Sequence, residues 1–477
     1  MQCTTRLTLL LALAILVYAA ALNVAPVAGQ EAARRPNVIL ITADDLGYGD
    51  LSCYGQKNFS TPHLDRLARE GIRFTQAYAG STVCAPSRCS LMTGLHTGHA
   101  RIRGNAKVSL RDDDITIAEV LKPAGYRTAH IGKWGCATPG SAGEPHKQGF
   151  DHWFGYVTNT EAHNYYPAFL WKNGERFELD NKVERGVSTN KATYTPELFT
   201  ADAMQFIEKN KSSPFFLYLG YTQPHANNEA GKAGMEVPDY GEYANKDWPD
   251  AQKGRAAMIA YLDRDIGRII QRLKELKIDE NTVVMFSSDN GPHKEGGSDA
   301  EFHNSNGPLR GIKRDLYDGG IRVPLIVRWP GKVNRGQTSD HLCAHWDLLP
   351  TIAEIAGIEP PSETDGISFY PTLLGDGAGD RQQRQHEFLY WEFHERGFQQ
   401  AARMGKWKGV RLKHGGQLEL YNLANDIAEE RNVADQHPEI AARIETYLKT
   451  ARTESPDWPI SPAPQAKGRK KAKGASL

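Results

Sequence analysis

Two short segments of this 477-residue chain could bind a metal ion through oxygen atoms. Asp44 and Asp45 are adjacent, and Asp289 is followed directly by Asn290. Neighbouring carboxylates repel each other unless solvent or a cation offsets their charge, and the Asp-Asn pair adds oxygen ligands. Such ligands suit Ca²⁺ better than Zn²⁺, and a site of several protein ligands suits Ca²⁺ somewhat better than Mg²⁺. Considered separately, each segment could be an ordinary cap or turn.

These segments follow two of the apolar runs that we expect to form strands. Apolar runs alternate with amphipathic helical stretches, which predicts an α/β domain with a mostly parallel sheet flanked by helices. Open sheets of this kind place ligand sites beyond the carboxyl ends of their strands, and Lys133 and His225 follow two further runs. The expected strands are 38–41, 128–131, 215–219, 282–286 and 323–327, and the expected helices are 61–70, 115–121, 196–209, 252–276 and 347–356.

A turn-rich segment, 375–380, separates this expected domain from a smaller one. We place the first at 36–375 and a C-terminal α+β subdomain at 381–455, with an antiparallel sheet closed by a helix over 438–451. Residues 456–477 are basic and lack apolar periodicity, which predicts a disordered tail. The expected C-terminal strands are 387–393, 399–404, 407–412 and 418–423.

Composition and the N-terminal segment restrict partners and location. Lys+Arg and Asp+Glu each total 57, so neither nucleic acid nor an anionic membrane is indicated as a partner. The apolar run from Leu7 to Leu22 predicts a secretory signal over 1–29, and hence a periplasmic or extracellular protein, or a lysosomal one in a eukaryote. An uncleaved membrane anchor is the alternative, but this run is shorter than the ~20 residues of a spanning helix, so no stable membrane span is expected. The scattered cysteines do not predict a disulfide framework.

The segment from Cys84 to Gly94, CAPSRCSLMTG, gives the strongest indication of function. It resembles the motif of the type I sulfatases, an arylsulfatase A-like family of the alkaline phosphatase superfamily, in which the cysteine of Cys-x-Pro-x-Arg is oxidised to formylglycine (3-oxoalanine). Considered alone, the segment could be a buried cysteine in a turn before a helix. The resemblance covers nearly the whole mature chain, and further matching segments are 44–50, 61–65, 132–134, 288–291, 311–313 and 318–324.

The resemblance implies an alkaline-phosphatase-like fold, one Ca²⁺ ion, and hydrolysis of sulfate esters of carbohydrates or smaller aryl alcohols. It also implies a formylglycine-generating enzyme as a partner during maturation. The implied metal ligands are Asp44, Asp45, Asp289, Asn290 and the modified Cys84. The implied neighbours of the sulfate are Arg88, Lys133, His225 and Lys313. These types suit the chemistry, because cations offset the charge of the sulfate and His225 or Lys313 could protonate the leaving oxygen.

One position departs from the family pattern. Many members have a histidine directly after Gly-Lys-Trp, where this chain has Gly135. We expect His163 to take its catalytic role, with His146 as the second choice. His163 could instead contact the substrate or simply pack, because geometry decides such roles.

Two other functions remain open. A phosphatase or phosphodiesterase of the same superfamily usually uses serine or threonine with two zinc ions and additional histidines, which the setting of Cys84 does not match. A non-enzymatic sulfoglycan-binding protein is suggested only by the missing histidine at Gly135.

Overall fold

The computed structural model describes residues 35–460. The predicted signal, 1–29, and residues 461–477 of the predicted tail lie outside the described residues. The strands of the large sheet are β1 (Asn37–Ala43), β2 (Ile72–Phe74), β4 (Arg127–Lys133), β5 (His152–Tyr156), β6 (Phe169–Lys172), β7 (Glu175–Glu178), β10 (Phe215–Gly220), β11 (Thr282–Ser288), β12 (Leu325–Arg328) and β13 (Gln337–Ser339). Their order is β13-β2-β12-β11-β1-β10-β4-β5-β6-β7.

The centre of this sheet is parallel. β11, β1, β10, β4 and β5 pair in parallel, whereas β12, β6 and β7 pair antiparallel with their neighbours. The predicted large, mostly parallel mixed sheet is therefore confirmed, and all five predicted strands are present. β12 begins at Leu325, two residues later than expected, because Pro324 has no N–H to donate to a neighbouring strand.

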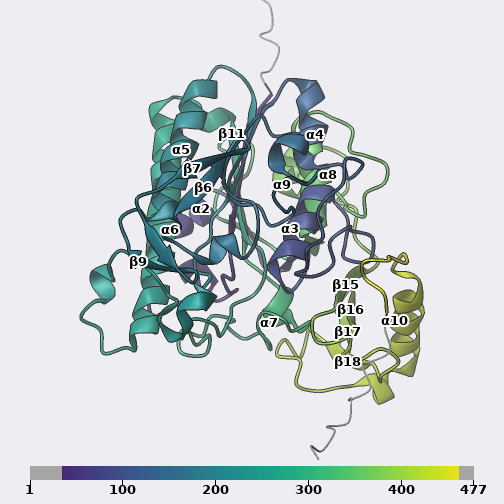
Figure 1. Cartoon of the computed structure of the whole chain (residues 1–477). Coiled ribbons are helices and arrows are strands. Elements are labelled where there is room, and N and C mark those ends of the chain that lie inside the picture. Colours follow the sequence, from purple (N-terminus) through teal and green to yellow (C-terminus); the bar gives the residue numbers. More distant parts are fainter. Residues whose placement is uncertain (1–34, 461–477) are drawn as a thin grey trace, which may run out of the picture. The chain divides into compact units, whose positions relative to one another are not determined.

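Helices cover both faces of the sheet (Figure 1). They are α2 (Pro62–Arg69), α3 (Cys84–Thr93), α4 (Ile117–Leu121), α5 (Thr195–Asn210), α6 (Asp250–Glu275), α7 (Asp318–Ile321), α8 (Leu348–Ile355) and α9 (Tyr370–Leu374). Val38 and Leu40 of β1 pack in one core with α3, α4 and α8, and Ile39 and Ile41 pack in a second core with α2, α5 and α6. Burial on both faces explains why β1 is a continuous apolar run instead of an alternating one.

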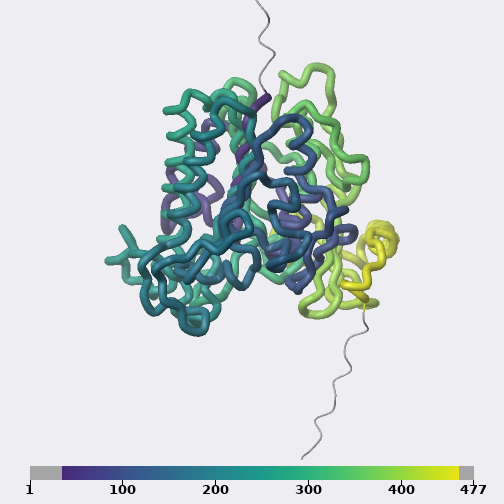
Figure 2. The backbone as a smooth tube through the Cα atoms, turned by 45° about the horizontal axis from the view of Figure 1, so that its top comes forward, coloured from purple at the N-terminus to yellow at the C-terminus, as the bar shows by residue number. Residues whose placement is uncertain are grey.

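A small antiparallel sheet follows near the C-terminus, as predicted. Its strands, in spatial order, are β15 (Leu389–Phe393), β16 (Gln399–Met404), β17 (Trp407–Arg411) and β18 (Glu419–Asn422), and α10 (Pro438–Thr450) packs against it. Figures 1 and 2 show these elements beside the helix layer that contains α3. The Trp391 indole N–H donates to the Ala79 carbonyl at 2.9 Å, and Lys408 pairs with Asp318 at 2.7 Å. These buried contacts join the small sheet to the segments around α3 and α7.

Two short pairs complete the strands, β3 (Ala77–Tyr78) with β14 (Cys343–Ala344), and β8 (Lys182–Glu184) with β9 (Val187–Asn190). The chain remains packed beyond 455, since Trp458 is buried and donates to the Arg101 carbonyl at 2.9 Å. Within 35–460, no helix has the length and apolar character needed to cross a membrane. The five cysteines of that range are all free thiols.

Candidate active site

Four central strands end in polar residues that meet at one edge of the sheet. These are Asp44 and Asp45 after β1, Lys133 at the end of β4, His225 after β10, and Asp289 after β11. Parallel pairing fixes the arrangement, because Ala43 of β1 lies in register with Ser288 of β11. The Asp45 N–H also donates to Asp289 Oδ1 at 3.1 Å. The structure thus brings together the strand-end residues that the sequence singled out.

Cys84 is the first residue of the buried helix α3. Arg88 lies four residues later, so the two side chains share one helix face. Cys84 Sγ lies 3.5 Å from Asn105 Oδ1, and the same oxygen accepts a hydrogen bond from the Ala85 N–H at 3.1 Å. Burial raises the pKa of the Cys84 thiol, which is therefore protonated at neutral pH.

Three buried cations pair with three buried carboxylates at this edge of the sheet. The pairs are Lys133 with Asp44 (Nζ to Oδ2, 2.6 Å), Lys313 with Asp45 (Nζ to Oδ2, 2.8 Å) and Arg88 with Asp289 (Nε to Oδ2, 2.9 Å). The side chains are at most 2% exposed, so neither sign is screened by solvent. The attraction within each close pair offsets the cost of removing its two charges from water.

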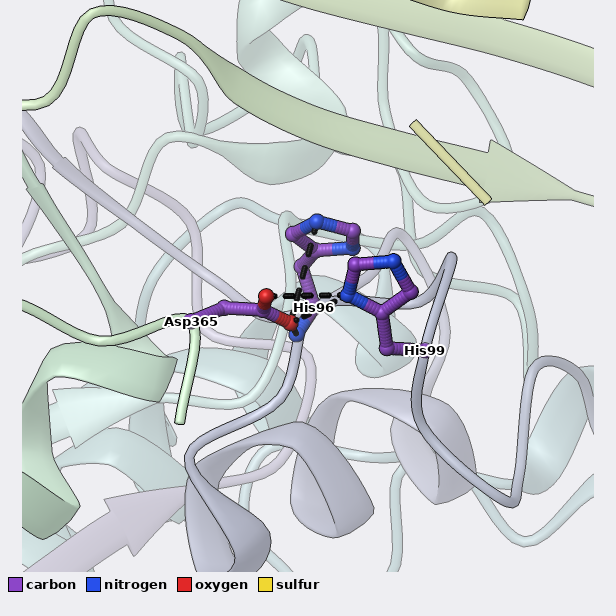
Figure 3. Close-up of side chains that lie close together, drawn as sticks. All are labelled: His96, His99 and Asp365. Carbon is purple, nitrogen blue, oxygen red and sulfur yellow. Dashed lines mark hydrogen bonds and ion pairs between the residues drawn. The ribbon is translucent and has the colours of Figure 1, made fainter. Parts of the chain in front are cut away.

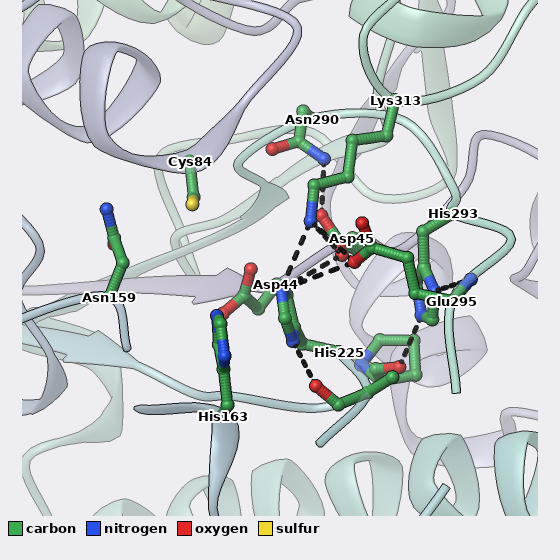
Figure 4. Close-up of polar contacts among 12 residues, drawn as sticks. Asp44, Asp45, Cys84, Asn159, His163, His225, Asn290, His293, Glu295 and Lys313 are labelled. Carbon is green, nitrogen blue, oxygen red and sulfur yellow. Dashed lines mark hydrogen bonds and ion pairs between the residues drawn. The ribbon is translucent and has the colours of Figure 1, made fainter. Parts of the chain in front are cut away.

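The oxygen atoms that we predicted as metal ligands are incompletely bonded. Asp44 Oδ1 and Asn290 Oδ1 are buried without a hydrogen-bond partner among the described residues. Asn290 Nδ2 donates to Asp45 Oδ1 at 2.6 Å, and in Figure 4 its free oxygen lies on the Cys84 side of the amide. Burial and the nearby charge of Asp44 raise the pKa of Asp289 to about 7. A divalent cation would satisfy the free oxygens and offset this repulsion, so the residues fit such an ion.

The side chains of His225 and Lys313 are in contact, and one proton lies between them. His225 Nδ1 lies 2.6 Å from the Ala226 carbonyl and must carry the hydrogen, which leaves Nε2 to accept from Lys313 Nζ at 3.1 Å. Burial and the Lys313 charge hold the pKa of His225 well below its usual range. Burial alone would lower the pKa of Lys313, but the charges of Asp45, Glu295 and Asp44 act together against it and raise that pKa. Lys313 therefore carries the proton and His225 is neutral.

Comparison with known proteins identifies the family of this chain. The family model described as Sulfatase matches residues 36–358, and a model described as N-sulphoglucosamine sulphohydrolase, C-terminal, matches residues 312–454. The N-acetylgalactosamine-6-O-sulfatase of Bacteroides thetaiotaomicron is 32% identical over 500 residues, covering 88% of this chain and 94% of that protein. The chain belongs to the sulfatase family. It is therefore a sulfuric ester hydrolase.

Other relatives agree with this assignment. The N-acetylgalactosamine-6-sulfatase of Homo sapiens is 33% identical over 369 residues, covering 72% of this sulfatase and 67% of the human protein. Among solved structures, Ps i-CgsB in complex with k-i-k-neocarrahexaose matches with a TM-score of 0.77 and 27% identity, covering 90% of this chain and 95% of that one.

The structure explains how this sulfatase accommodates Gly135. The residue has a φ of +79°, a left-handed conformation, and a Cβ there would lie 2.7 Å from Asn159 Oδ1. Asn159 Oδ1 is buried without a hydrogen-bond partner among the described residues, and Asn159 Nδ2 lies 3.4 Å from Asn105 Oδ1. The Asn159 carboxamide therefore occupies the direction that a side chain at position 135 would take.

The two histidines predicted as substitutes lie in different places. His163, at the end of the 3-10 helix Glu161–His163, stacks on His225 with ring centroids 4.9 Å apart. In Figure 4 its ring points toward Asp44 and Cys84. His146 instead stacks on Trp153, and its side chain is 39% exposed. The geometry thus brings His163 to the site and gives His146 contacts elsewhere.

Two polar residues beside Lys313 and the start of α3 were not predicted from the sequence. Glu295 Oε2 lies 3.3 Å from Lys313 Nζ, and Glu295 Oε1 accepts from Arg314 at 2.6 Å. Asn105 contacts the start of α3, as described above. Glu295 lies in the Gly-rich loop after Asn290, which is a signal that could have drawn attention to it. Asn105 lies in an irregular loop that offers no such signal.

His96 and His99, which follow α3, form a separate cluster with Asp365 (Figure 3). His99 Nδ1 lies 2.9 Å from Asp365 Oδ1, and the Asp365 carboxylate accepts from the His96 N–H at 3.0 Å. His96 Nδ1 accepts from the Gly98 N–H at 3.1 Å. These hydrogen bonds hold the loop after α3 against the segment around Asp365.

Proposed function

We propose that this sulfatase hydrolyses sulfate monoesters of sulfated carbohydrates, with Cys84 converted to formylglycine and one Ca²⁺ bound beside it. The observation that carries the proposal is the buried set of Arg88, Lys133 and Lys313 around the start of α3. Three fixed cations in a site closed to solvent are what a sulfate group requires. The relatives support a carbohydrate substrate, since those from B. thetaiotaomicron and human are named N-acetylgalactosamine-6-sulfatases.

The nucleophile would come from the modified residue at position 84. The buried thiol of unmodified Cys84 is protonated, because its pKa is raised, and a protonated thiol is a weak nucleophile. Hydrated formylglycine would supply a hydroxyl nucleophile in its place, and a bound metal ion would activate that hydroxyl. We assign Asp44, Asp45, Asp289 and Asn290, together with the modified Cys84, as the residues that would hold this ion.

The remaining residues would bind the sulfate and manage one proton. Lys133 and Arg88 are immobilised by Asp44 and Asp289, so they can hold the anionic oxygens without reorganising. Lys313 carries the proton that the departing alcohol needs, and His225 Nε2 lies 3.1 Å from it. The leaving oxygen would receive the proton from Lys313, directly or through His225.

The arrangement favours this reaction over a two-metal phosphatase. Asp45, His225, His293 and Glu295 contribute to groups of ligand atoms close enough to hold an ion. However, Lys313 Nζ lies among them, 2.8 Å from Asp45 and 3.3 Å from Glu295. An ammonium group therefore supplies positive charge where a second metal would have to bind.

We also propose export of the mature protein, domain boundaries at 36–375 and 381–455, and maturation by a formylglycine-generating enzyme. Export is supported by the signal pattern over 1–29. Maturation is supported by the Cys84–Gly94 motif and by the position of Cys84 at the start of α3.

The mass of the peptide that contains Cys84 tests this function. Tryptic cleavage after Arg73 and Arg88 separates Cys84 from Cys89, which serves as an internal control. We expect the aldehyde mass at Cys84 and the thiol mass at Cys89. Uniformly unmodified Cys84 from a competent native host would refute the proposal. Parallel assays with sulfate and phosphate esters, with and without a chelator, should show chelator-sensitive hydrolysis of the sulfate ester.

A further inference from the structure

The site contains a histidine that is held by a carboxylate from a distant loop. We propose that Glu229 is a positioning residue that fixes the ring and tautomer of His163, so that the His163–Glu229 pair replaces the histidine absent at Gly135. The inference rests on the proposed function, because it assigns a proton-transfer role within the same site. Glu229 lies on the 3-10 segment Asn228–Ala233, 66 residues after His163.

The contact between the two side chains determines which ring nitrogen is free. His163 Nδ1 lies 3.2 Å from Glu229 Oε2 and 3.3 Å from Oε1. A carboxylate only accepts hydrogen bonds, so Nδ1 must carry the hydrogen. The neutral ring therefore keeps its lone pair on Nε2. In Figure 4 the His163 ring points toward Asp44 and Cys84. The ring that carries this lone pair therefore faces the position of the proposed nucleophile.

The electrostatic surroundings require such a partner. Burial and the charge of Lys133 lower the pKa of His163, whereas Glu229 acts in the opposite direction. A neutral histidine without a fixed hydrogen bond divides between two tautomers, and only one of them has a basic Nε2. Nε2 would accept a proton from a hydroxyl group in the pocket, and the resulting imidazolium would be paired with Glu229 until that proton passes to solvent.

Glu229 is itself held in place. Asn227 Oδ1 accepts from the Glu229 N–H at 3.2 Å, and Asn227 Nδ2 donates to Glu236 at 2.8 Å. A Cβ at Gly186, which has a φ of +80°, would lie 2.7 Å from Glu229 Cγ, so the turn between β8 and β9 packs directly on this side chain. Among residues 35–460, His163 is the only ion-pair partner of Glu229.

Ring stacking on His225 restrains the His163 ring in a second way. Its ring lies nearly parallel to that of His225, at an interplanar angle of 14°. His225 is held by the Ala226 carbonyl and by Lys313. The stacking limits tilting of the His163 ring, and Glu229 limits its rotation about the Cβ–Cγ bond. The pair is therefore oriented before any ligand binds.

Variants of Glu229 test the proposal with two independent readouts. We expect Glu229→Gln and Glu229→Ala to lower kcat by about 10- to 100-fold with a small change in KM, the range seen when a residue behind a functional ligand is removed. Glu229→Asp should restore part of the activity. The double variant with Glu229→Ala and His163→Gln should have nearly the same kcat as His163→Gln alone, since the two residues act as a unit. Glu208→Gln, which removes an exposed carboxylate paired with Arg272, is the control and should leave kcat unchanged.

The second readout is the pKa of His163 itself, measured by NMR titration of the imidazole C–H signals and assigned by their loss in His163→Gln. The pKa should fall in Glu229→Ala, because a stabilising negative charge is removed. An unchanged pKa, or a kcat within about twofold of wild type when the control behaves as expected, would overturn the inference. If the wild-type protein hydrolyses no sulfate ester, the proposed function fails, while the NMR titration still decides whether Glu229 controls His163.

Discussion

The Gly-Lys-Trp-Gly segment contains two glycines that should differ sharply in their tolerance of a side chain. Both have positive φ, +103° at Gly132 and +79° at Gly135. A Cβ at Gly132 would lie 2.0 Å from the backbone oxygen of Gly220, its partner on β10. A Cβ at Gly135 would lie 2.7 Å from Asn159 Oδ1, the end of a side chain that can move.

These contacts set the expected magnitudes. A non-glycine residue in the left-handed region costs roughly 1–2 kcal/mol, so Gly135→Ala should lower the free energy of unfolding by about that amount. Gly132→Ala adds a backbone collision that can be relieved only by separating β4 from β10. We expect Gly132→Ala to lower the free energy of unfolding by more than about 4 kcal/mol, a loss that only severe disruptions of the core produce.

Urea denaturation of the two variants measures this difference. A double-mutant cycle of Gly135→Ala with Asn159→Ala should give a coupling below about 0.5 kcal/mol if backbone conformation dominates the cost. Gly135→His should not raise kcat, because Asn159 already occupies the direction of the new side chain. The reasoning is refuted if Gly132→Ala is as stable as Gly135→Ala, or if Gly135→His is as stable as wild type and faster.

Three further predictions concern the ion, the buried charges and pH. Ca²⁺ should raise the melting temperature of wild type but not of Asp289→Asn, by the equivalent of about 2.7 kcal/mol at roughly 100-fold excess over Kd, and sulfate should add to the rise only when Ca²⁺ is present. Lys408→Met should lower the free energy of unfolding by about 3–5 kcal/mol in urea, since it leaves the Asp318 carboxylate buried without its lysine. Burial opposes the charged form of His386, but the charge and hydrogen bond of Asp347, 2.7 Å away, together with the charge of Asp365, raise the pKa above 6.5. The stability advantage of wild type over His386→Gln should therefore be complete below pH 6.5 and disappear as the pH rises through the raised pKa, whereas an advantage that persists at high pH would contradict this assignment.

The central sheet could be predicted because its strands are buried on both faces. β1 and β11 consist of residues with no exposure, and such strands are continuous apolar runs. The edge strands offered no comparable signal. β7 is exposed at all four positions and carries three charged residues, so its pairing with β6 depends on the intervening turn and not on apolar pattern. The antiparallel direction of β12 likewise depends on the path of the chain.

The strand-end residues of the site were predictable for the same reason, since each follows a recognisable apolar run. Glu229, Asn105 and Glu295 were not, because their positions depend on loops that approach across the fold. Glu229 reaches His163 through the packing of the β8–β9 turn, and Asn105 reaches Cys84 from the loop that follows α3. The approach of Asn105 depends on this irregular loop, and neither spacing follows a helix or strand period. The motif identified the position of the proposed nucleophile but not the side chains that surround it.

The charges of the site explain why metal and sulfate should bind together. When all six groups are ionised, Asp44, Asp45 and Asp289 are balanced by Lys133, Lys313 and Arg88, so the buried set has no net charge. A sulfate anion entering that set would lose its hydration without meeting any excess of positive charge. A divalent cation among the same carboxylates would supply the excess and lower the pKa of Asp289, which burial and Asp44 raise to about 7. The lysines and the arginine would then be available to the anion, because the ion would offset part of the charge of the carboxylates that pair with them.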